Sequence, residues 1–457
     1  MNARPVPADT IVAAATPPGR GGVAIVRISG AMVPEMATVL LGELPPPRQA
    51  IFARWQDADG ELLDLGLALY FPAPHSFTGE HVLELHGHGG DVVVEALIER
   101  VVQLGARRAR AGEFSERAFR NDKIDLAQAE AIADLIDAGS RRAAQAAMRS
   151  LQGEFSARVN ATRAALTSLR VYVEAAIDFP EEEIDFLAST ELRERLADVQ
   201  QRLTSVLRAA EQGAILTRGL TVAIAGRPNA GKSTLMNALA GQDVAIVTPV
   251  AGTTRDVLRQ RVEIAGVPVE LIDTAGLRDS NGDAIEAEGI RRARAAIARA
   301  DHLLFVVDGA ADPDLRAYEG ERSSLPAGVP VSIVMNKVDL LEGSARTAPK
   351  REALPVALLA VSAATGAGLD ALRQHLAASV GTTEEGGGAF SARARHVEAL
   401  RRATAHLDTA AAQLAAKQGE LAAFELREAQ RELGEVVGDV SSDELLGKIF
   451  GSFCIGK

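Results

Sequence analysis

The sequence holds a single cysteine, Cys454, among its 457 residues. One thiol cannot close a disulfide within the chain, which fits a reducing compartment. No stretch is apolar for long enough to cross a bilayer, and the opening residues MNARPVPADT lack the charged-then-apolar layout of a secretory signal. We therefore expect a cytoplasmic protein with no membrane partner.

The chain also lacks an excess of positive charge. It has 49 Lys and Arg against 61 Asp and Glu, a formal net charge of −12. This balance excludes broad electrostatic coating of nucleic acid. A local basic patch that binds nucleic acid is still compatible with this charge. Its candidate residues, each of which could instead lie on a solvated helix face or loop, are Arg107, Arg108, Arg110, Arg117, Arg120 and Lys123.

The length predicts two or three domains, and 47% hydrophobic with 24% charged residues is typical of a globular protein. Residues 1–121 alternate strand patterns with turns. The run VAIVRISG predicts a strand, LALYFPAPHSFTGEHVLELHGHGG predicts strand, loop and strand, and DVVVEALIERVVQLG predicts a helix ending at Gly105. We expect a small α/β or α+β domain here.

The rest of the chain divides into a helical segment, a segment of alternating strands and helices, and a second helical segment. Residues 122–216 are helical in pattern, and residues 217–380 alternate helices with the strand runs TVAIAG, VELIDTAG, HLLFVVDG and VPVSIVMNKVD. The latter predict a doubly wound parallel sheet with its ligand at the carboxyl ends of the strands. After the linker pattern GTTEEGGG, helical spacing returns within residues 381–457.

Each helical segment needs a partner for its apolar stripe. We expect the two segments to pack together, with the α/β unit inserted between them. The apolar residues at helical spacing are Leu151, Phe155, Val159, Leu166, Leu169, Val173 and Ile177 in the first segment and Val397, Leu400, Leu407, Leu414 and Leu421 in the second.

A phosphate-binding loop stands at the start of the α/β unit. GRPNAGKST, residues 226–234, fits G-x-x-x-x-G-K-[ST] between a predicted strand and a predicted helix. Its glycines let backbone N–H groups surround phosphate oxygens, Lys232 suits the β- and γ-phosphates, and Ser233 suits Mg²⁺. In the later motifs GTTRD and DTAG, Thr254 suits Mg²⁺, Asp273 its water shell, and the Gly276 N–H the γ-phosphate.

Guanine recognition is predicted by NKVD and VSAATG. The Asp339 carboxylate can accept hydrogen bonds from the guanine N1–H and 2-amino group, and adenine offers no matching donors. Asn336 can tie this loop to the phosphate loop, and the backbone of residues 362–364 can meet guanine O6. Five motifs in this order predict a GTPase.

One position departs from the Ras-like pattern. Leu277 follows DTAG, where Ras-like GTPases carry a glutamine that orients the attacking water. Leucine cannot make a hydrogen bond, so either hydrolysis is slow or another group orients the water. Glu286 and Glu288 in the following loop could do so, or they are ordinary charges at a helix start.

The segments DTIVAAATPPGRGGVAIVRISG, PHSFTGEHVLELHGHGG, GEFSERAFRNDKIDLAQAEAIADLIDA, EAAIDFPEEEIDF and GSFCIGK resemble the MnmE (TrmE) family of bacterial tRNA-modification GTPases. The resemblance covers essentially the whole chain. It implies a multidomain α/β plus α fold. A Ras-like P-loop GTPase domain (217–380) would be inserted into a helical domain (122–216 and 381–457). An α+β domain for folate binding and dimerisation (1–121) would precede them.

The resemblance also implies partners and cofactors. The homodimer would form a heterotetramer with the FAD protein MnmG (GidA). Together they would add an aminomethyl or carboxymethylaminomethyl group to C5 of the wobble uridine of certain tRNAs. A 5-formyl- or methylene-tetrahydrofolate would supply the one-carbon unit, and GTP hydrolysis would drive or time the reaction. K⁺ between paired GTPase domains would neutralise developing charge as an arginine finger does.

Family residues carry over to positions of this chain. Glu286 matches the catalytic glutamate. Mg²⁺ would be held by Ser233 and Thr254, K⁺ by oxygens of Asn229, Thr248, Val250 and Thr253, and folate by Arg27, Glu84, Lys123 and Lys457. Motifs and resemblance together assign GTP binding to Asn229, Ala230, Gly231, Lys232, Ser233, Thr234, Thr248, Pro249, Val250, Ala251, Gly252, Thr253, Thr254, Asp273, Thr274, Ala275, Gly276, Asn336, Lys337, Asp339, Ser362, Ala363 and Ala364.

The tail CIGK would lie beside the folate. Cys454 is then a nucleophile or acid/base in one-carbon chemistry, or a small buried residue at a docked terminus. The run SSDELLGKIFGSF predicts a helix that docks the tail. Arg27 lies mid-strand among apolar neighbours, which suits a ligand or a solvated strand end. His86 and His88 alternate on one strand face, without a third ligand nearby to support a metal site.

Two other functions compete with tRNA modification. The first is a regulatory or ribosome-assembly GTPase without modification chemistry, and the second is a folate enzyme with a vestigial GTPase domain. The CIGK tail and the folate-like N-terminal segment argue against the first. The complete set of guanine and phosphate motifs argues against the second.

Overall fold

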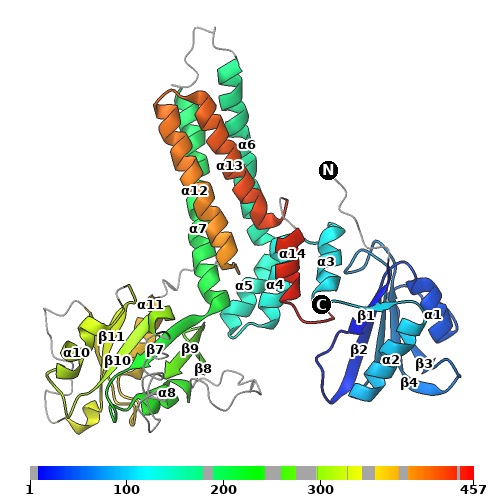
Figure 1. Cartoon of the computed structure of the whole chain (residues 1–457), viewed down its shortest axis with the longest axis horizontal. Coiled ribbons are helices and arrows are strands. Elements are labelled where there is room, and N and C mark those ends of the chain that lie inside the picture. Colours follow the sequence, from blue (N-terminus) through cyan, green and yellow to red (C-terminus); the bar gives the residue numbers. More distant parts are fainter. Residues whose placement is uncertain are drawn as a thin grey trace. The chain divides into compact units, whose positions relative to one another are not determined.

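The chain folds into two compact units. The computed structural model describes residues 9–178, 189–241, 259–273, 295, 297–326, 328–341, 356–379, 390–439 and 443–456. Its N-terminal unit comprises Met1–Ala133 with Gln430–Lys457, and its central unit comprises Asp134–Ala429. Figure 1 shows the elements of both, coloured along the sequence.

The N-terminal unit is built on a six-stranded sheet with the order β3-β4-β5-β2-β1-β6. Its strands are antiparallel neighbours except for the parallel pair β1 and β6. The predicted strands and the predicted helix of this region are present as β2, β4, β5 and α2. The elements are β1 Ile11–Ala14, β2 Gly21–Ser29, α1 Val33–Leu41, β3 Ile51–Gln56, β4 Leu62–Phe71, β5 Val82–Gly89, α2 Asp91–Gln103, β6 Arg107–Arg108, α3 Glu113–Arg120 and α14 Asp443–Gly451.

Helices α1 and α2 cover one face of this sheet. Val26 and Ile28 of β2 are buried there with Leu83 and Leu85 of β5. The opposite face, which we call the open face, carries the alternate residues of the same strands. Apolar side chains are exposed on the β2, β3 and β4 part of this face, with Val23 at 62%, Phe52 at 67% and Leu67 at 43%. On β1, Ile11 and Ala13 of the same face are buried against Phe114 of α3. The part of the face away from β1 is therefore available to a ligand or partner.

The C-terminal run forms the predicted docking helix, α14, and its partner is α3. Helix α14 buries Leu446, Ile449 and Phe450 against Phe119 of α3 and the first turn of α4 (Leu126–Ile136). The tail then runs beside the segment that joins β6 to α3, where Ala111 and Ile455 form an antiparallel bridge and the Gly112 N–H donates to the Cys454 carbonyl at 3.3 Å.

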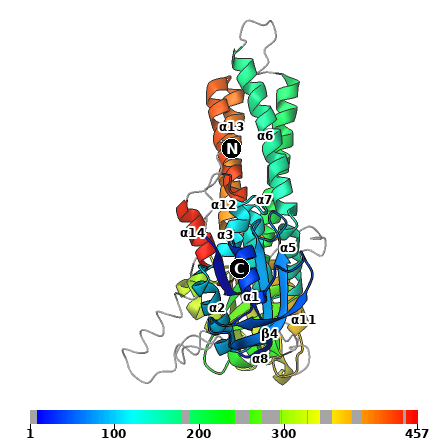
Figure 2. The same ribbon diagram turned by 90° about the vertical axis from the view of Figure 1, so that its right-hand side faces the viewer.

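In the central unit, helices from both sides of the α/β region pack together, as predicted. Helices α6 and α12 each pack against α7, and Figures 1 and 2 show α6, α7, α12 and α13 side by side. The predicted stripe is buried at Phe155, Val159, Leu166 and Val173. The helices are α5 Arg141–Leu151, α6 Glu154–Asp178, α7 Thr190–Arg218, α12 Ala394–Ala415 and α13 Gly419–Val437.

One member of the predicted second stripe is wrong. Val397, Leu400, Leu407 and Leu414 are buried on α12, but Leu421 is 52% exposed. The chain turns after α12, and Leu421 belongs to α13, whose buried face differs. The linker pattern GTTEEGGG lies outside the described residues.

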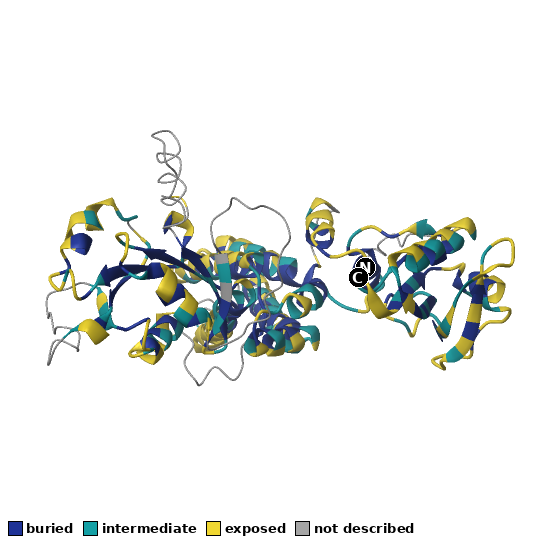
Figure 3. Cartoon of the chain, turned by 90° about the horizontal axis from the view of Figure 1, so that it is seen from below, coloured by how far each residue is buried: buried dark blue, intermediate teal, exposed yellow. Residues whose placement is uncertain are grey.

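The α/β region between α7 and α12 contains the second sheet, ordered β12-β11-β10-β7-β9-β8. All its neighbours are parallel except β8 and β9. Separate apolar clusters pack on its two faces, and Figure 3 shows its strands as largely buried. The elements are β7 Leu220–Ala225, α8 Lys232–Ala240, β8 Arg259–Ile264, β9 Val267–Asp273, β10 His302–Asp308, α10 Arg316–Glu321, β11 Val331–Asn336, β12 Ala357–Ala360 and α11 Leu369–Ser379.

Candidate functional site

The phosphate loop joins β7 to α8 and needs glycine at two positions. A Cβ on Gly226 would lie 2.2 Å from the Val306 carbonyl oxygen, and one on Gly231 would lie 2.3 Å from Asn336 Nδ2. Both glycines have positive φ, of 140° and 87°. Helix α8 begins at Lys232 without a side-chain cap, and the N-terminus of a helix suits an anion.

Lys232 lies over this loop with its side chain largely buried. Its Nζ donates to the carbonyl oxygens of Gly226 and Arg227 at 2.9 and 2.8 Å. The ammonium is thereby held at the point where the loop turns around the space for a phosphate. Phosphate oxygens are stronger acceptors than these carbonyls, so this position suits the predicted contact with the β- and γ-phosphates.

A hydroxyl and a carboxylate meet at the start of α8. Ser233 Oγ donates to Asp273 Oδ2 at 3.1 Å, which joins the phosphate loop to the end of β9. Hard oxygen ligands of this kind fit Mg²⁺ bound with several waters. Among the described residues, no cluster of three or more His, Cys, Asp or Glu side chains could hold a metal ion. A metal here would therefore depend on the nucleotide and water for most of its ligands.

The guanine loop is tied to the phosphate loop through Asn336, as predicted. Asn336 Nδ2 donates to the Ala230 carbonyl at 3.0 Å, and its Oδ1 accepts from the Ala363 N–H at 3.0 Å. One buried amide thus fixes three loops. Asp339 lies in the short helix Val338–Leu340 with its side chain exposed, and no partner for its carboxylate lies among the described residues. The Ala364 N–H next to Ala363 is likewise free there.

Sequence reasoning missed Asp308, at the end of β10. Its Oδ2 accepts from Lys337 Nζ at 2.7 Å, and its Oδ1 accepts from the N–H groups of Ala310 and Ala311. Burial acts to raise the pKa of Asp308, but the hydrogen bond from Lys337 and those backbone groups lower it below its ordinary value. The signal in the sequence was an acid that ends the buried strand HLLFVVD beside the strand of NKVD.

On the open face of the N-terminal sheet, two of the predicted folate residues lie together. Arg27 Nε donates to Glu84 Oε1 at 2.8 Å across the β2–β5 register. Arg27 also lies over the ring of Phe114, 5.7 Å from its centroid. It is interior to the sheet, so the solvated strand end is not its setting. Lys123 is exposed and donates to the Pro74 carbonyl at 2.9 Å, in a separate contact.

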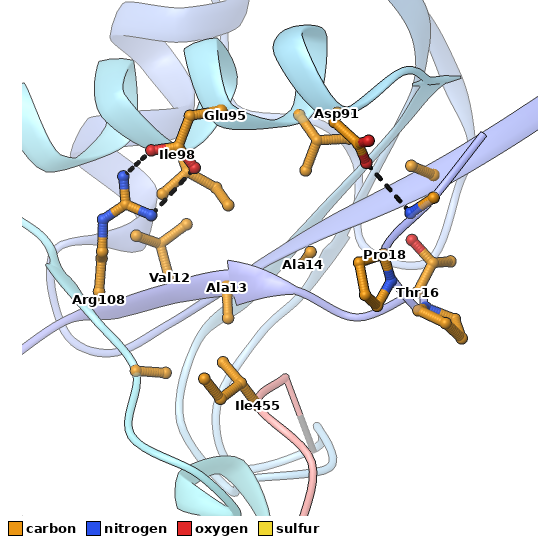
Figure 4. Close-up of a pocket in the computed structure, with 15 residues that line it drawn as sticks. Val12, Ala13, Ala14, Thr16, Pro18, Asp91, Glu95, Ile98, Arg108 and Ile455 are labelled. Carbon is orange, nitrogen blue, oxygen red and sulfur yellow. Dashed lines mark hydrogen bonds and ion pairs between the residues drawn. The ribbon is translucent and has the colours of Figure 1, made fainter. Parts of the chain in front are cut away.

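A cavity of about 400 Å³ lies between β1 and helix α2. Figure 4 shows Val12, Ala14 and Ile98 lining it, with Ile455 of the tail at its border. The charged side chains that line it bind other groups of the lining: Asp91 accepts from the Gly19 N–H, and Glu95 pairs with Arg108. This volume is in the usual range for small-molecule pockets.

Cys454 precedes Ile455 and is exposed. The reading of this thiol as a small buried residue is therefore wrong, because the tail docks through α14 and leaves the Cys454 side chain outside the packed helix. Its position beside the cavity leaves a chemical role open. The terminal Lys457 lies outside the described residues.

The candidate basic patch is neutralised by acids. Arg117 is buried and binds Asp9, Glu80 and Glu113. Burial acts to raise the pKa of Glu113, but Arg107, the Arg110 N–H and Arg117 hold it at about 2. The other arginines of the group are paired as well, Arg107 with Asp9 and Glu113, Arg108 with Glu95, Arg110 with Glu113 and Glu116, and Arg120 with Glu116. Arg107 and Arg117 join α3 to the sheet region through Glu113 and Glu80, and these paired side chains form no free phosphate-binding surface.

Other predicted residues lie outside the described part of the chain. They are Thr248, Pro249, Val250, Ala251, Gly252, Thr253, Thr254, Thr274, Ala275, Gly276, Leu277, Glu286 and Glu288. The assignments of the switch threonine, the K⁺ ligands other than Asn229, and the catalytic glutamate remain predictions from sequence. Asn229 itself is exposed in the phosphate loop with φ 63°.

The chain matches two family models over most of its length. One, described as the MnmE helical domain, matches residues 126–454, and the other, described as the GTP-binding protein TrmE N-terminus, matches residues 10–123. The chain is 55% identical over 455 residues to the tRNA modification GTPase MnmE of Sodalis glossinidius (strain morsitans). That alignment covers 98% of this chain and 99% of the relative.

Solved structures resemble parts of the chain. The crystal structure of Aquifex aeolicus Era bound to GDP and AlF₄⁻ is 28% identical, covers 41% of this chain and 66% of its own, and has a TM-score of 0.29. A GTP-binding protein of Sulfolobus solfataricus in complex with GDP is 15% identical, covers 48% and 67%, and has a TM-score of 0.27. At these TM-scores the likenesses add nothing to the family matches.

Proposed function

The chain belongs to the MnmE family of tRNA modification GTPases, and we propose that it hydrolyses GTP while it modifies tRNA together with the FAD protein MnmG. The product is an aminomethyl or carboxymethylaminomethyl group on C5 of the wobble uridine, with the one-carbon unit drawn from a tetrahydrofolate. The observation that carries the GTPase part is the junction at Asn336, which joins the phosphate loop to both guanine loops through Ala230 and Ala363. The tRNA part is supported by the relative named tRNA modification GTPase MnmE, which is 55% identical over 99% of its own length.

GTP would be held by two sets of groups. Backbone N–H groups at the start of α8 and the Lys232 ammonium face the phosphates, and Ser233 and Asp273 suit Mg²⁺ with Thr254. The exposed Asp339 carboxylate accepts from the guanine N1–H and 2-amino group. The Ala363 N–H is engaged by Asn336, so the Ala364 N–H remains for guanine O6.

Guanine specificity is tested by Asp339→Asn. The substitution turns one acceptor oxygen into an amide that faces the guanine donors, so affinity for GTP should fall by roughly ten- to a hundredfold and affinity for xanthosine triphosphate should rise. Direct binding measurements with both nucleotides give the answer. Equal affinity of the wild type and the variant for GTP contradicts the assignment of Asp339.

Hydrolysis would use Glu286 to orient water, because Leu277 cannot. K⁺ bound by oxygens of Asn229, Thr248, Val250 and Thr253 would neutralise developing charge between paired GTPase domains. Na⁺ is smaller and fits the same oxygens poorly. We predict that turnover falls several-fold when Na⁺ replaces K⁺ at constant ionic strength, with GTP affinity as the control. Identical rates in the two salts contradict a K⁺ site.

A tetrahydrofolate fits the open face of the N-terminal sheet. The pair of Arg27 and Glu84 is partly buried and offers both a charged donor and charged acceptors beside the Phe114 ring. A bound folate would supply the one-carbon unit, and Arg27 and Glu84 would orient its polar ring, with Lys123 and Lys457 contributing further contacts. The tail with Cys454 would complete this site.

The apolar residues of the open face also support a homodimer through the N-terminal unit, in a heterotetramer with MnmG. Among the described residues, no helix is long and apolar enough to cross a membrane. We place the complex in the cytoplasm. The division into residues 1–121, 122–216, 217–380 and 381–457 is part of this proposal.

The alternative is a regulatory GTPase without modification chemistry. Reconstitution separates the two functions. The purified chain with MnmG, unmodified tRNA, GTP, K⁺ and 5-formyl- or methylene-tetrahydrofolate should form modified wobble uridine, detected by mass analysis of nucleosides. Omission of GTP or of this chain should abolish the product. GTP hydrolysis without any modified nucleoside would favour the regulatory function.

A further inference from the structure

His86 lies beside Glu84 on the open face. The two residues alternate on β5, so their side chains project from the same side of the sheet. Glu84 pairs with Arg27 of β2 and with Leu69 of β4 in the register, and His86 pairs with Ile25 and Leu67. The imidazole is thus a near neighbour of a carboxylate on a face that also carries Arg27 and exposed apolar side chains.

The Glu84 carboxylate receives one donor on each oxygen. Arg27 Nε donates to Oε1 at 2.8 Å, and His86 Nε2 lies 3.2 Å from Oε2. An ionised carboxylate only accepts hydrogen bonds, so the proton of this second contact belongs to His86 Nε2. Two donors from two different strands fix the plane of the carboxylate. The Glu84 side chain is still 16% exposed, and each oxygen keeps a lone pair for a ligand.

The polar edge of a pterin presents two parallel donors, the ring N3–H and the 2-amino group. A carboxylate with a fixed plane can accept both at once, whereas a freely rotating one loses entropy when it binds. We propose that His86 is a positioning residue of the tetrahydrofolate site. It donates its Nε2–H to Glu84 and holds that carboxylate ready for the pterin edge. This inference rests on the proposed folate function.

A metal site is the competing explanation for two histidines on one face. His88 instead binds Asp64, through Nδ1 to Oδ1 at 2.8 Å and through its backbone N–H to Oδ2 at 2.8 Å. His86 therefore contacts Glu84 and His88 contacts Asp64, so the two imidazoles do not share a ligand. His88 also provides a matched control, because it lies on the same strand and face, is 69% exposed in its side chain, and does not touch Glu84.

The test is binding of 5-formyltetrahydrofolate to the full-length protein, measured by calorimetry without GTP, MnmG or tRNA. His86→Ala removes the donor and should weaken binding by about tenfold, the usual size of a hydrogen bond to a charged group. His86→Gln should stay within about threefold of the wild type, because its amide nitrogen can donate from nearly the same place as Nε2. His88→Ala should bind as the wild type does.

Circular dichroism and thermal melting check that each variant is folded. If His86→Ala is unfolded, the comparison of wild type with His86→Gln and His86→Glu decides, because a second acid beside Glu84 should weaken binding more than the alanine does. Unchanged affinity in His86→Ala or His86→Glu overturns the inference, as does equal weakening in His86→Gln and His86→Ala. A wild-type protein that binds no folate overturns the proposed folate function itself, and the two failures are thereby distinguished.

Discussion

At the scale of single residues, the motifs predicted one supporting contact of the nucleotide site and missed another. Asn336 was expected to tie two loops, and its amide does so. Asp308 belongs to no motif, and its ion pair with Lys337 depends on the pairing of β10 with β11, which sets Asp308 opposite Asn336. Sequence spacing cannot give such a register, because it arises from the packing of the whole sheet.

Asp308 should act on the nucleotide through Lys337. The alkyl stem of Lys337 passes Gly231 of the phosphate loop, with Cε 3.9 Å from the place of a Cβ there, and ends at Asp308. Asp308→Ala frees that side chain, so affinity for GTP and GDP should fall by about tenfold. Turnover at saturating GTP should change less than twofold, because the reacting phosphate is not touched.

A double-mutant cycle with Lys337→Ala tests the route. Once Lys337 is absent, Asp308→Ala should cost no further affinity. Asp314→Ala, an exposed acid in the loop before α10, is the control and should bind normally. Additive losses from Asp308→Ala and Lys337→Ala would show that Asp308 acts by another path.

At the scale of elements, the sequence located the strands of the second sheet that are long apolar runs and missed β8, which is not. Strands β7, β9, β10 and β11 were expected from long apolar runs. Strand β8 was missed because charged residues alternate with apolar ones in RQRVEI, the pattern of an edge strand. The hairpin of β8 and β9 begins three residues after the GTTRD motif and ends on the first residue of DTAG.

This hairpin is clamped by the start of α5. Ser140 Oγ accepts from the Ala143 N–H at 3.1 Å as an N-cap and donates to the Gly266 carbonyl at 2.8 Å. Arg142 Nη1 donates to the neighbouring Ala265 carbonyl at 3.1 Å. The turn between β8 and β9 is thereby joined to the helical part of the same unit. A serine before a helical run predicts an N-cap, but the Gly266 carbonyl that also binds Ser140 lies 126 residues away in the sequence.

Ser140→Ala removes both the cap and the contact with the turn. Amide exchange in the first turn of α5 and in the β8–β9 hairpin should accelerate about five- to tenfold, the effect expected for loss of an N-cap. GTP affinity should be unchanged, and tRNA modification should fall because the β8–β9 hairpin, which lies between GTTRD and DTAG in the sequence, loses its link to α5. Hydrogen exchange read by mass spectrometry measures the first effect.

Ser168→Ala is the matched control for this clamp. Ser168 is an exposed helical serine whose hydroxyl donates to the Ala164 carbonyl within α6. Its loss should alter neither exchange nor modification. Wild-type exchange at the hairpin in Ser140→Ala would remove the basis for this coupling.

At the scale of the whole molecule, the sequence predicted the insertion of the α/β region between helices that pack together. The segment before the α/β region does pack on the segment after it, through α7 and α12, although the apolar stripe named for the first segment lies on α5 and α6. The open face of the N-terminal sheet was not predicted. Several of its residues, such as Val23, Phe52 and Leu67, are apolar and would be predicted as core from the sequence. They are exposed because α1 and α2 both pack on the other face. That face and the GTP site are the two surfaces on which the proposed function depends.

The most direct test of the account is mass analysis of tRNA nucleosides from a strain that lacks this chain, complemented with the wild type or with Lys232→Ala. Lys232 is the ammonium of the phosphate loop, and its loss should abolish GTP-dependent function. We predict loss of the C5-modified wobble uridine in the deletion strain, recovery with the wild type, and no recovery with Lys232→Ala. Unchanged wobble uridines in the deletion strain would contradict the account.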